Sequence, residues 1–425
     1  MIETVMTRDY FERSTSKVVG DVLVIGVGFC GGAVANELQR RGYESFYINT
    51  AVSDFTNLEQ VTEEMIFPIP KSKGCDKDQE KALQLISPYV GDILIHTEEN
   101  YTKYKHFIFV AGAGGGTGGG TVSALAEYFH TQGKKTSIIG VLPSKEESKK
   151  NIQNAIRFMK EVDSRCREIS SILYLDNTTV EDKRDINLVL AEQIDFILSL
   201  SEYSVVTTNT NMKATDAPEN LGLLSVAGYV HIDKVVTNDN ESSLGTSVVK
   251  ANKAPVPRVV QKRTEKAGNY ILEPFAYGVE CSNIMRKEFA IAISLTVNLY
   301  PKEDGGAVEF DPSPIVEKYG KPSSDIKLGY NASGSTYVYV FGTEPSQDLI
   351  DRYAYYLDEI EQDEMKREKN RVELEFSEIQ GETKDITIKE KSVTDIFGTP
   401  KKPQSVLQSK KPDIFKKPNP FPLKK

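Results

Sequence analysis

Cysteine is scarce in this chain, and its spacing excludes the common sites that are built on it. Only four cysteines occur, Cys30, Cys75, Cys166 and Cys281, and no two of them form a C-x-x-C pair. Structural zinc sites take closely spaced cysteines, and disulfide frameworks are typical of oxidising compartments. The sequence therefore predicts no metal-ligating residues and a protein of the reducing cytoplasm.

Long apolar runs are also missing. No stretch approaches the roughly 20 consecutive apolar residues that a membrane-spanning helix needs. Residues 1–20 lack the apolar centre of a signal peptide, because charged side chains interrupt them. We therefore expect a soluble cytoplasmic protein with no membrane partner.

The lysine-containing phosphate loop of the commonest NTPases is a third absence. No G-x-x-x-x-G-K-[ST] segment occurs, which disfavours a P-loop NTPase. Glycine itself is abundant, and its densest run, residues 111–121, follows an apolar stretch of strand length at residues 106–110. Residues 122–129 then have helical spacing. The context is therefore a strand, a glycine loop and a helix.

So many glycines predict positive φ angles and a close approach of the main chain to a ligand. Main-chain N–H groups at a helix N-terminus hold phosphate, because the unsatisfied donors and the helix dipole point the same way. Thr117 adds a hydroxyl to the loop. A flexible glycine linker is the alternative, but linkers are seldom flanked so closely by a strand and a helix.

A second glycine loop lies earlier in the chain. Residues 21–25 are an apolar run of strand length, and Gly26 to Gly32 follow it in the G-x-G-x-x-G pattern of dinucleotide-binding proteins. The next predicted strand, residues 45–48, ends in Asn49-Thr50 and not in the acidic residue that holds the ribose of NAD. This weakens the interpretation as a nicotinamide or flavin enzyme and leaves it as an alternative.

Strands and helices alternate through the first half of the chain, which predicts an α/β domain with a mostly parallel sheet. Ligands bind such sheets at the carboxyl ends of the strands. Both glycine loops, Glu147 and Asn177 follow predicted strands and are expected at that edge.

The predicted organisation has six parts, of which the last is disordered because it is rich in Lys and Pro. They are an N-terminal helical extension (1–20), a nucleotide-binding domain (21–181), a core connecting helix (182–203), a second α/β domain (204–345), a long C-terminal helix (346–380) and the tail (381–425).

The net charge of −9 is unevenly distributed. Nine lysines against Asp395 and Asp413 give residues 391–425 about +7, so the preceding residues carry about −16. An acidic body argues against general nucleic-acid binding, whereas a basic tail is a candidate interaction arm. Asp-Ile-Phe occurs twice in this tail, at 395–397 and 413–415, each near a Lys-Lys pair. The repeat is either a docking motif or part of a solubilising tail.

The residues of the two glycine loops resemble the tubulin and FtsZ family. Residues 114–120, Gly-Gly-Gly-Thr-Gly-Gly-Gly, are similar to the family signature GGGTGxG, and residues 25–32 are similar to its first phosphate loop. The resemblance covers about the first 240 residues. It implies a GTPase domain, a connecting helix and an activating domain, with GTP or GDP and Mg²⁺ as ligands.

The resemblance also assigns nucleotide contacts residue by residue. Glu147 is implied as the ribose contact, and Asn177 and Asn187 as the residues that recognise guanine, because an amide both donates and accepts hydrogen bonds. A helix cap and a polar helix residue are the alternatives for the two asparagines. The full set of implied contacts is Gly26, Gly28, Phe29, Cys30, Gly31, Asn49, Thr50, Gly114, Gly115, Gly116, Thr117, Gly118, Gly119, Glu147, Asn177 and Asn187.

The family completes its active site across a subunit interface with an acidic loop. Residues 211–216 resemble that loop, although Lys213 replaces an expected acid. Asp216 is therefore the candidate that positions or activates water, with Glu219 in reserve. The alternative for Asp216 is a surface residue that caps the following helix.

The long C-terminal helix and basic tail are most similar to the TubZ branch, which segregates plasmid or phage DNA in bacteria. The resemblance implies head-to-tail filaments of this chain and a DNA-binding adaptor of TubR type, or DNA itself, bound by tail residues 391–425. Cell division of the FtsZ kind is the first alternative. A non-polymerising dinucleotide enzyme is the second.

Overall fold

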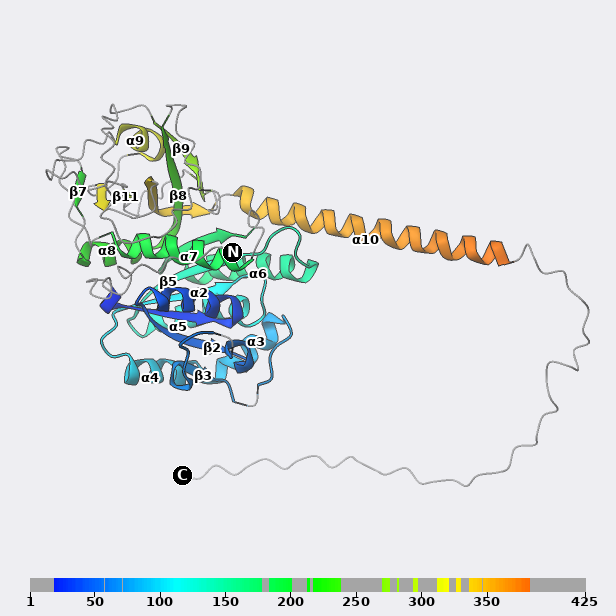
Figure 1. The fold of residues 1–425 in the computed structure, drawn as a ribbon, viewed down its shortest axis with the longest axis horizontal. Helices are drawn as coiled ribbons and strands as arrows, with labels where there is room; N and C mark the ends of the chain where they lie inside the picture. The colour runs from blue at the N-terminus through cyan, green and yellow to red at the C-terminus, as the bar shows by residue number, and fades with distance from the viewer. Residues whose placement is uncertain are drawn as a thin grey trace, which may run out of the picture. The chain divides into compact units, whose positions relative to one another are not determined.

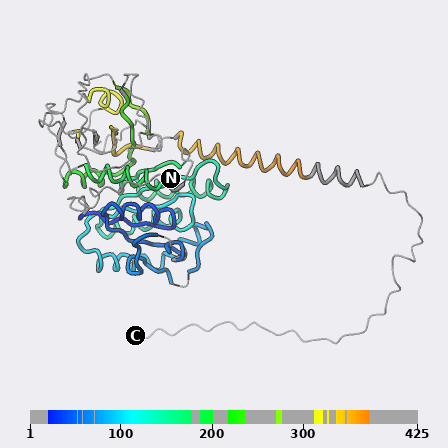
Figure 2. Tube along the Cα trace, viewed as in Figure 1, coloured from blue at the N-terminus to red at the C-terminus, as the bar shows by residue number. Residues whose placement is uncertain are grey.

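The computed structural model describes a folded body and a long C-terminal helix (Figures 1 and 2). The described residues are 19–56, 58–70, 72–177, 183–200, 212–214, 217–237, 270–275, 281–282, 293–296, 312–320, 326–329, 336–345 and 347–382. Residues 1–363 form one compact unit and residues 364–425 form another. Residues 1–18 of the predicted helical extension, residues 211, 215 and 216 of the predicted acidic loop, and the tail from residue 383 lie outside the described residues.

A parallel sheet forms the first half of the larger unit, as predicted. Its order is β3-β2-β1-β4-β5-β6, and every neighbouring pair is parallel. The strands are nearly all buried, as expected for a sheet covered on both faces. Their bounds are β1 (Val22–Val27), β2 (Glu44–Asn49), β3 (Ile66–Pro68), β4 (His106–Gly112), β5 (Lys135–Leu142) and β6 (Ser170–Asp176).

Helices cover both faces of this sheet (Figure 1). Alternate residues of β1 belong to two different apolar clusters, Val24 to one and Ile25 to the other. The first cluster includes α2 (Gly28–Arg40) and α7 (Lys183–Leu198), and the second includes the other helices of this half. These are α3 (Gln79–Ile86), α4 (Val90–Asn100), α5 (Thr117–Thr131) and α6 (Lys149–Cys166). Short 3₁₀ helices occupy Val19–Asp21, Val52–Phe55, Glu63–Met65 and Ser87–Tyr89.

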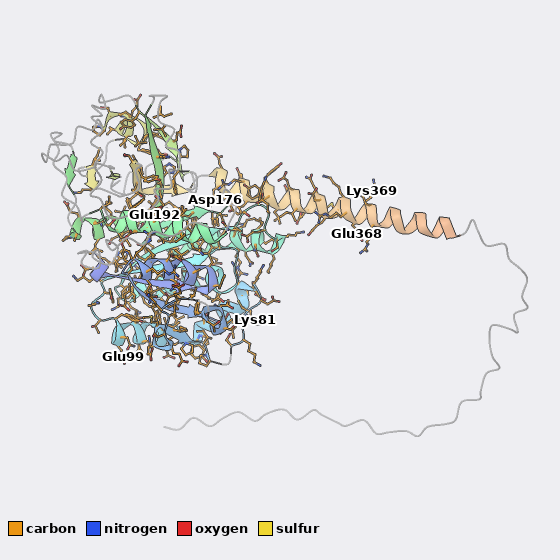
Figure 3. All side chains as sticks on the ribbon, viewed as in Figure 1. Lys81, Glu99, Asp176, Glu192, Glu368 and Lys369 are labelled. Carbon is orange, nitrogen blue, oxygen red and sulfur yellow. The ribbon has the colours of Figure 1, made fainter. Side chains whose placement is uncertain are left out.

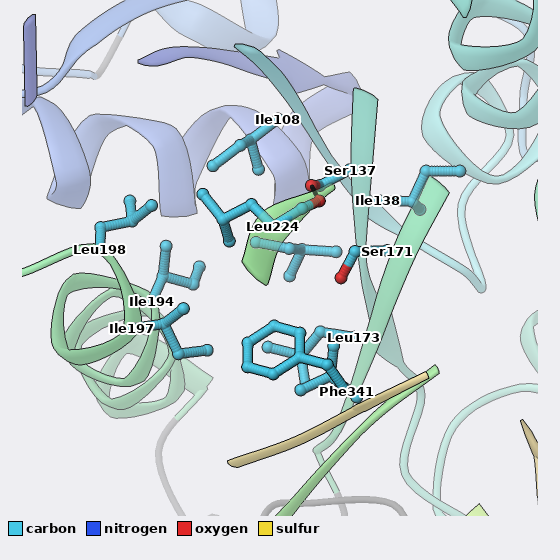
Figure 4. A pocket seen from close by; sticks show the side chains of 12 residues that line it. Ile108, Ser137, Ile138, Ser171, Leu173, Ile194, Ile197, Leu198, Leu224 and Phe341 are labelled. Carbon is cyan, nitrogen blue, oxygen red and sulfur yellow. Dashed lines mark hydrogen bonds between the residues drawn. The ribbon is translucent and has the colours of Figure 1, made fainter. Parts of the chain in front are cut away.

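Helix α7 lies within the segment 182–203, which the sequence predicts to be a connecting helix, and most of its side chains from Leu190 onward are buried. Its polar side chains are satisfied inside the protein: Tyr43 donates to Asp195 at 2.8 Å, and Tyr339 donates to Gln193 at 3.0 Å. Burial raises the pKa of Glu192 on the same helix, which is labelled in Figure 3. A cavity of about 20 Å³ lies between α7 and the sheet (Figure 4). It is large enough for one water molecule and far too small for a nucleotide.

The same sheet continues into the second half of the chain and becomes mixed. Strand β8 pairs in parallel with β6 and antiparallel with β13. The described part of the predicted strand 291–300 is β11, and β13 includes residues 336–341 of the predicted strand 335–341 and continues to Pro345. The elements are β7 (Met212–Ala214), α8 (Ala217–Leu224), β8 (Gly228–Thr237), β9 (Tyr270–Pro274), β10 (Cys281–Ser282), β11 (Ile293–Thr296), α9 (Ser313–Tyr319), β12 (Ile326–Gly329) and β13 (Thr336–Pro345).

A buried acid fastens α9 to β8. Asp233 accepts hydrogen bonds from Tyr319 and, at 2.7 Å, from Lys318, and its other oxygen lies 2.9 Å from Nε2 of His231. Burial alone raises the pKa of Asp233, but the bonds with His231, Lys318 and Tyr319 outweigh it and hold this pKa below its usual value. The acid is therefore ionised in the fold.

Helix α10 (Gln347–Glu382) confirms the predicted long C-terminal helix. Leu349 and Tyr353 are buried in the second apolar cluster, and Arg352 forms an ion pair of 3.1 Å with Asp176 at the end of β6. Asp176 is labelled in Figure 3. From residue 364 to 371 every side chain is exposed. Among the described residues, no helix is both long enough and apolar enough to span a membrane.

Candidate nucleotide-binding site

The two glycine loops meet at the carboxyl ends of β1 and β4. Gly28, the first residue of α2, has a φ of 73°, and a Cβ added there would lie 2.9 Å from the amide nitrogen of Gly118. A Cβ added at Gly118 would lie 2.5 Å from the carbonyl oxygen of Val27. Only glycine allows this approach, so helices α2 and α5 begin side by side.

The glycines of residues 111–121 are needed for a different reason from the one predicted. No residue from 111 to 121 has a positive φ, so the expected left-handed loop is wrong. These glycines are needed because the chain packs against itself: a Cβ at Gly119 would lie 2.6 Å from the oxygen of Ala113, and one at Gly120 would lie 2.5 Å from the oxygen of Gln79. Gly115 has more room, because the nearest atom to a Cβ added there is the oxygen of Gly112, at 3.5 Å.

The helices that follow the glycine loops have no side-chain caps. The residues before α2 and α5 are Val27 and Gly116, which have no side-chain acceptor and cannot cap the first turn. By contrast, Asp78 caps α3 and Ser148 caps α6. Among the described residues, the first turns of these two adjacent helices thus lack side-chain caps, and the positive ends of their dipoles lie together. That combination suits the phosphates of a nucleotide.

Thr117 connects three loops. Its hydroxyl lies 2.7 Å from that of Thr50 and 3.4 Å from the sulfur of Cys75, and the residue is only 7% exposed. The neighbouring Asn49 donates to Asp54 at 2.8 Å. The structure therefore brings together the predicted loop after β2 and the predicted hydroxyl of the glycine loop.

Two buried amides that the sequence did not reveal shape the glycine loop. Nε2 of Gln79 lies 3.1 Å from the oxygen of Ala113 and 3.2 Å from that of Gly115. Asn154 donates to the oxygens of Gly114 at 3.0 Å and Lys77 at 2.8 Å. The loop carbonyls are thus occupied by protein donors. No local motif marks Gln79 or Asn154, because each comes from a helix distant in sequence.

The segment before α3 is strained beside this loop. Asp76 and Lys77 are consecutive non-glycine residues with φ near 55°, at 53° and 56°. A Cβ at Gly116 would lie 2.9 Å from the Cα of Lys77. Such conformations cost about 1–3 kcal/mol each and cluster at ligand sites.

Glu147 and Asn177 lie together, as the sequence predicted for one edge of the sheet. Nδ2 of Asn177 is 3.5 Å from one carboxylate oxygen of Glu147, and Asn151 donates to the other at 2.5 Å. Asn151 was not predicted. Asn187 is half-buried on α7, and among the described residues no hydrogen bond joins it to this group.

The remaining predicted contacts occupy different environments. Cys30 is half-buried, and its Cβ would lie 2.8 Å from a Cβ added at Gly112. Phe29 is 61% exposed. Asp216 lies outside the described residues, and Glu219 on α8 accepts a hydrogen bond of 2.6 Å from Lys327.

Residues 21–183 match the model of the Tubulin/FtsZ family, GTPase domain. This segment is a tubulin/FtsZ family domain. The match covers the parallel sheet and both glycine loops, which are the features on which the sequence resemblance was based.

Individual tubulin-like relatives agree with this assignment. The tubulin-like protein TubZ of a Clostridium botulinum C phage is 28% identical over 188 residues, which are 43% of this chain and 49% of that protein. The tubulin-like protein CetZ of Pyrococcus abyssi is 25% identical over 230 residues, or 50% of this chain and 61% of the relative. The aligned regions thus span about half to three fifths of these relatives.

Solved tubulin-like structures share the fold over more of the chain. A tail-truncated TubZ of Clostridium botulinum phage c-st gives a TM-score of 0.60 at 21% identity, covering 82% of this chain and 99% of that one. A GTPγS-form protofilament of Bacillus thuringiensis serovar israelensis TubZ also gives 0.60, at 18% identity, with coverage of 86% and 98%.

Proposed function

We propose that this protein binds GTP and hydrolyses it to GDP. The observation that carries the proposal is the pair of uncapped helix N-termini, α2 and α5, which the two glycine loops bring side by side. They would hold the phosphates, while Glu147 contacts the ribose and Asn177 and Asn187 recognise guanine. Mg²⁺, when bound, would neutralise phosphate charge and retain water ligands, as it does in most nucleotide sites.

Hydrolysis in this proposal is completed by a second copy of the chain. The glycine loops supply main-chain donors to the phosphates, so a carboxylate must come from elsewhere to orient the attacking water. Asp216 is the proposed residue. Glu219 is the less favoured one, because its carboxylate already binds Lys327 at 2.6 Å.

The proposed assembly is a head-to-tail filament that segregates plasmid or phage DNA in the bacterial cytoplasm. Its support is the likeness to TubZ structures, one of which is a protofilament and another a two-stranded filament. The basic tail, residues 391–425, would bind a DNA-binding adaptor of TubR type or DNA itself. The proposal also has two domains, residues 21–181 and 204–345, joined by the helix 182–203.

Light scattering and phosphate release, measured together with GTP, ATP or no nucleotide in the presence of Mg²⁺, test the function. A rise in scattering with GTP alone, followed by decay as phosphate appears, is the expected result. Phosphate release without a rise in scattering would contradict the proposed filament. Absence of both signals, with a tightly bound coloured cofactor on purification, would favour the dinucleotide enzyme.

A further inference from the structure

Asn151 joins the two ends of the proposed site. It lies in the first turn of α6, where its main-chain N–H is 3.3 Å from the hydroxyl of the capping residue Ser148. Its Cβ lies 3.1 Å from a Cβ added at Gly114, so it packs against the start of the glycine loop. Its amide donates to Glu147 at 2.5 Å. Asn151 therefore contacts both the phosphate loop and the predicted ribose contact.

Two amide oxygens in this group have no donor. Asn151 and Asn177 each direct an NH₂ group at the carboxylate of Glu147, and their Oδ1 atoms are buried without a hydrogen-bond partner among the described residues. The carboxylate fixes the orientation of both amides, because a flipped amide would place an oxygen against it. Asn177 is only 9% exposed. Buried acceptors of this kind are normally satisfied, so these two oxygens are suited to accept from a ligand or a water.

The position of the group indicates which donor it is. In a nucleotide, the sugar lies between the phosphates and the base. Asn151 packs against Gly114 of the phosphate loop, and its partner Glu147 contacts Asn177, the proposed base contact, so the Asn151–Glu147 pair connects the two. Ribose presents two vicinal hydroxyls, which are donors for the carboxylate and the amide oxygens. The terminal torsion of Asn is broad, so a small rotation brings its oxygen to an entering hydroxyl.

We propose that Asn151 sets the preference of this site for ribose over deoxyribose, by holding the carboxylate of Glu147 against the sugar and offering its own Oδ1 as a second acceptor. The inference rests on the proposed GTP binding and assigns a residue and a selectivity to it. Asn151 is a positioning residue, because it acts on the sugar largely through Glu147.

Calorimetric binding of GDP, 2′-deoxyGDP, 3′-deoxyGDP and IDP to the full chain tests this, since diphosphates avoid hydrolysis. The wild type should bind GDP about tenfold more tightly than either deoxy analogue, as expected for one hydrogen bond to a charged group. Asn151→Leu, which neither donates nor accepts, should lose most of that tenfold preference while its affinity for the deoxy analogues stays nearly unchanged. Gln153→Leu, at an exposed position of the same helix, is the matched control.

The alternatives give different results. A purely structural role would weaken all four ligands by the same factor and leave the ratio of GDP to deoxyGDP affinity at its wild-type value, which overturns the inference. A changed ratio of GDP to IDP affinity alone would move Asn151 to the base and also overturn it. If circular dichroism shows Asn151→Leu to be unfolded, Asn151→Ala, which also neither donates nor accepts, gives the same comparison. Wild-type protein that binds none of the four would refute the proposed function itself.

Discussion

At the scale of single residues, the glycines of the site are required by the packing of the chain on itself. A Cβ added at Gly31 would lie 2.0 Å from the carbonyl oxygen of Val110, and the obstacle is main chain, which cannot rotate away. Gly31→Ala should therefore push α2 off β4 and destabilise the protein by about 2 kcal/mol or more. Gly222→Ala on α8, where no described residue lies within 4 Å of an added Cβ, is the control and should be neutral or slightly stabilising. Urea unfolding of both variants measures the difference, and equal stabilities would contradict this account.

Thr117 is the second residue for which the structure gives a sharp expectation. Thr117→Ala removes the hydroxyl that lies between Thr50 and Cys75, and the buried Thr50 hydroxyl then loses its contact. The loss should cost about 1–2 kcal/mol and weaken GTP binding and GTP-dependent scattering about tenfold. Thr131→Ala, at the exposed end of the same helix, should leave both unchanged. Wild-type assembly by Thr117→Ala would refute a role for this hydroxyl.

Sequence predicted this site only in part. The two glycine loops, Thr50, Glu147 and Asn177 were found because each follows a strand, and parallel strands bring their ends to one edge. Gln79, Asn151 and Asn154 were missed because they act from helices through single amides. Contacts of that kind produce no recognisable spacing of residues in the local sequence. The conformation of the glycine run was mispredicted for the same reason, since composition does not distinguish a left-handed loop from a tightly packed one.

At the scale of elements, β4 and β5 share a buried histidine. His106, the first residue of β4, lies 2.7 Å from the hydroxyl of Ser137, and burial, with a smaller effect from Lys135, lowers its pKa from 6.5 to about 3. In the unfolded chain this histidine takes up a proton below about pH 6.5, whereas in the fold it stays neutral down to about pH 3. Its contribution to stability is therefore complete above pH 6.5 and declines as the pH falls toward 3.

His106→Gln should remove that part of the pH dependence. For the wild type, His106 contributes a loss of about 1.4 kcal/mol of unfolding free energy per pH unit below about pH 6. The comparison is urea unfolding at pH 7, 6 and 5, with the exposed His130→Gln as the control that keeps the wild-type slope. An unchanged slope in His106→Gln would show that the buried ring is not the source.

The C-terminal helix illustrates what element patterns predict and what they leave out. Apolar periodicity predicted a helix from residue 346, and α10 begins at Gln347. Its docking was not predictable: Tyr353 donates to the oxygen of Pro143 at 2.7 Å, and Arg352 pairs with Asp176. Asp176 directly precedes Asn177, and Pro143 lies four residues before Glu147, so both partners are close in sequence to residues proposed to contact the nucleotide. The start of α10 is therefore structurally joined to the edge of the sheet that carries the site.

At the scale of the whole molecule, GTP hydrolysis is expected to depend on Asp216. Asp216→Ala should leave GTP binding intact, because no nucleotide contact is assigned to it, and should slow phosphate release at least tenfold. The filaments should persist, since GTP in them is not turned over. Glu219→Ala is the comparison. Turnover that survives in Asp216→Ala and falls in Glu219→Ala would move the catalytic role to Glu219.

The folded body and the basic tail are expected to have separate roles, the body in assembly and the tail in binding an adaptor–DNA complex. A chain that ends at residue 380 loses all nine lysines of the 391–425 segment, so it should assemble with GTP but no longer bind an adaptor–DNA complex. If charge drives that binding, wild-type affinity should fall steeply with salt, because lysines release counterions from phosphates. Replacing Phe397 and Phe415 by Ala keeps every charge and removes the aromatic residue of each Asp-Ile-Phe repeat. Loss of binding in this variant would assign docking to the repeats, whereas unchanged binding would assign it to the lysines. A truncated chain that cannot assemble would show instead that the tail contributes to the filament.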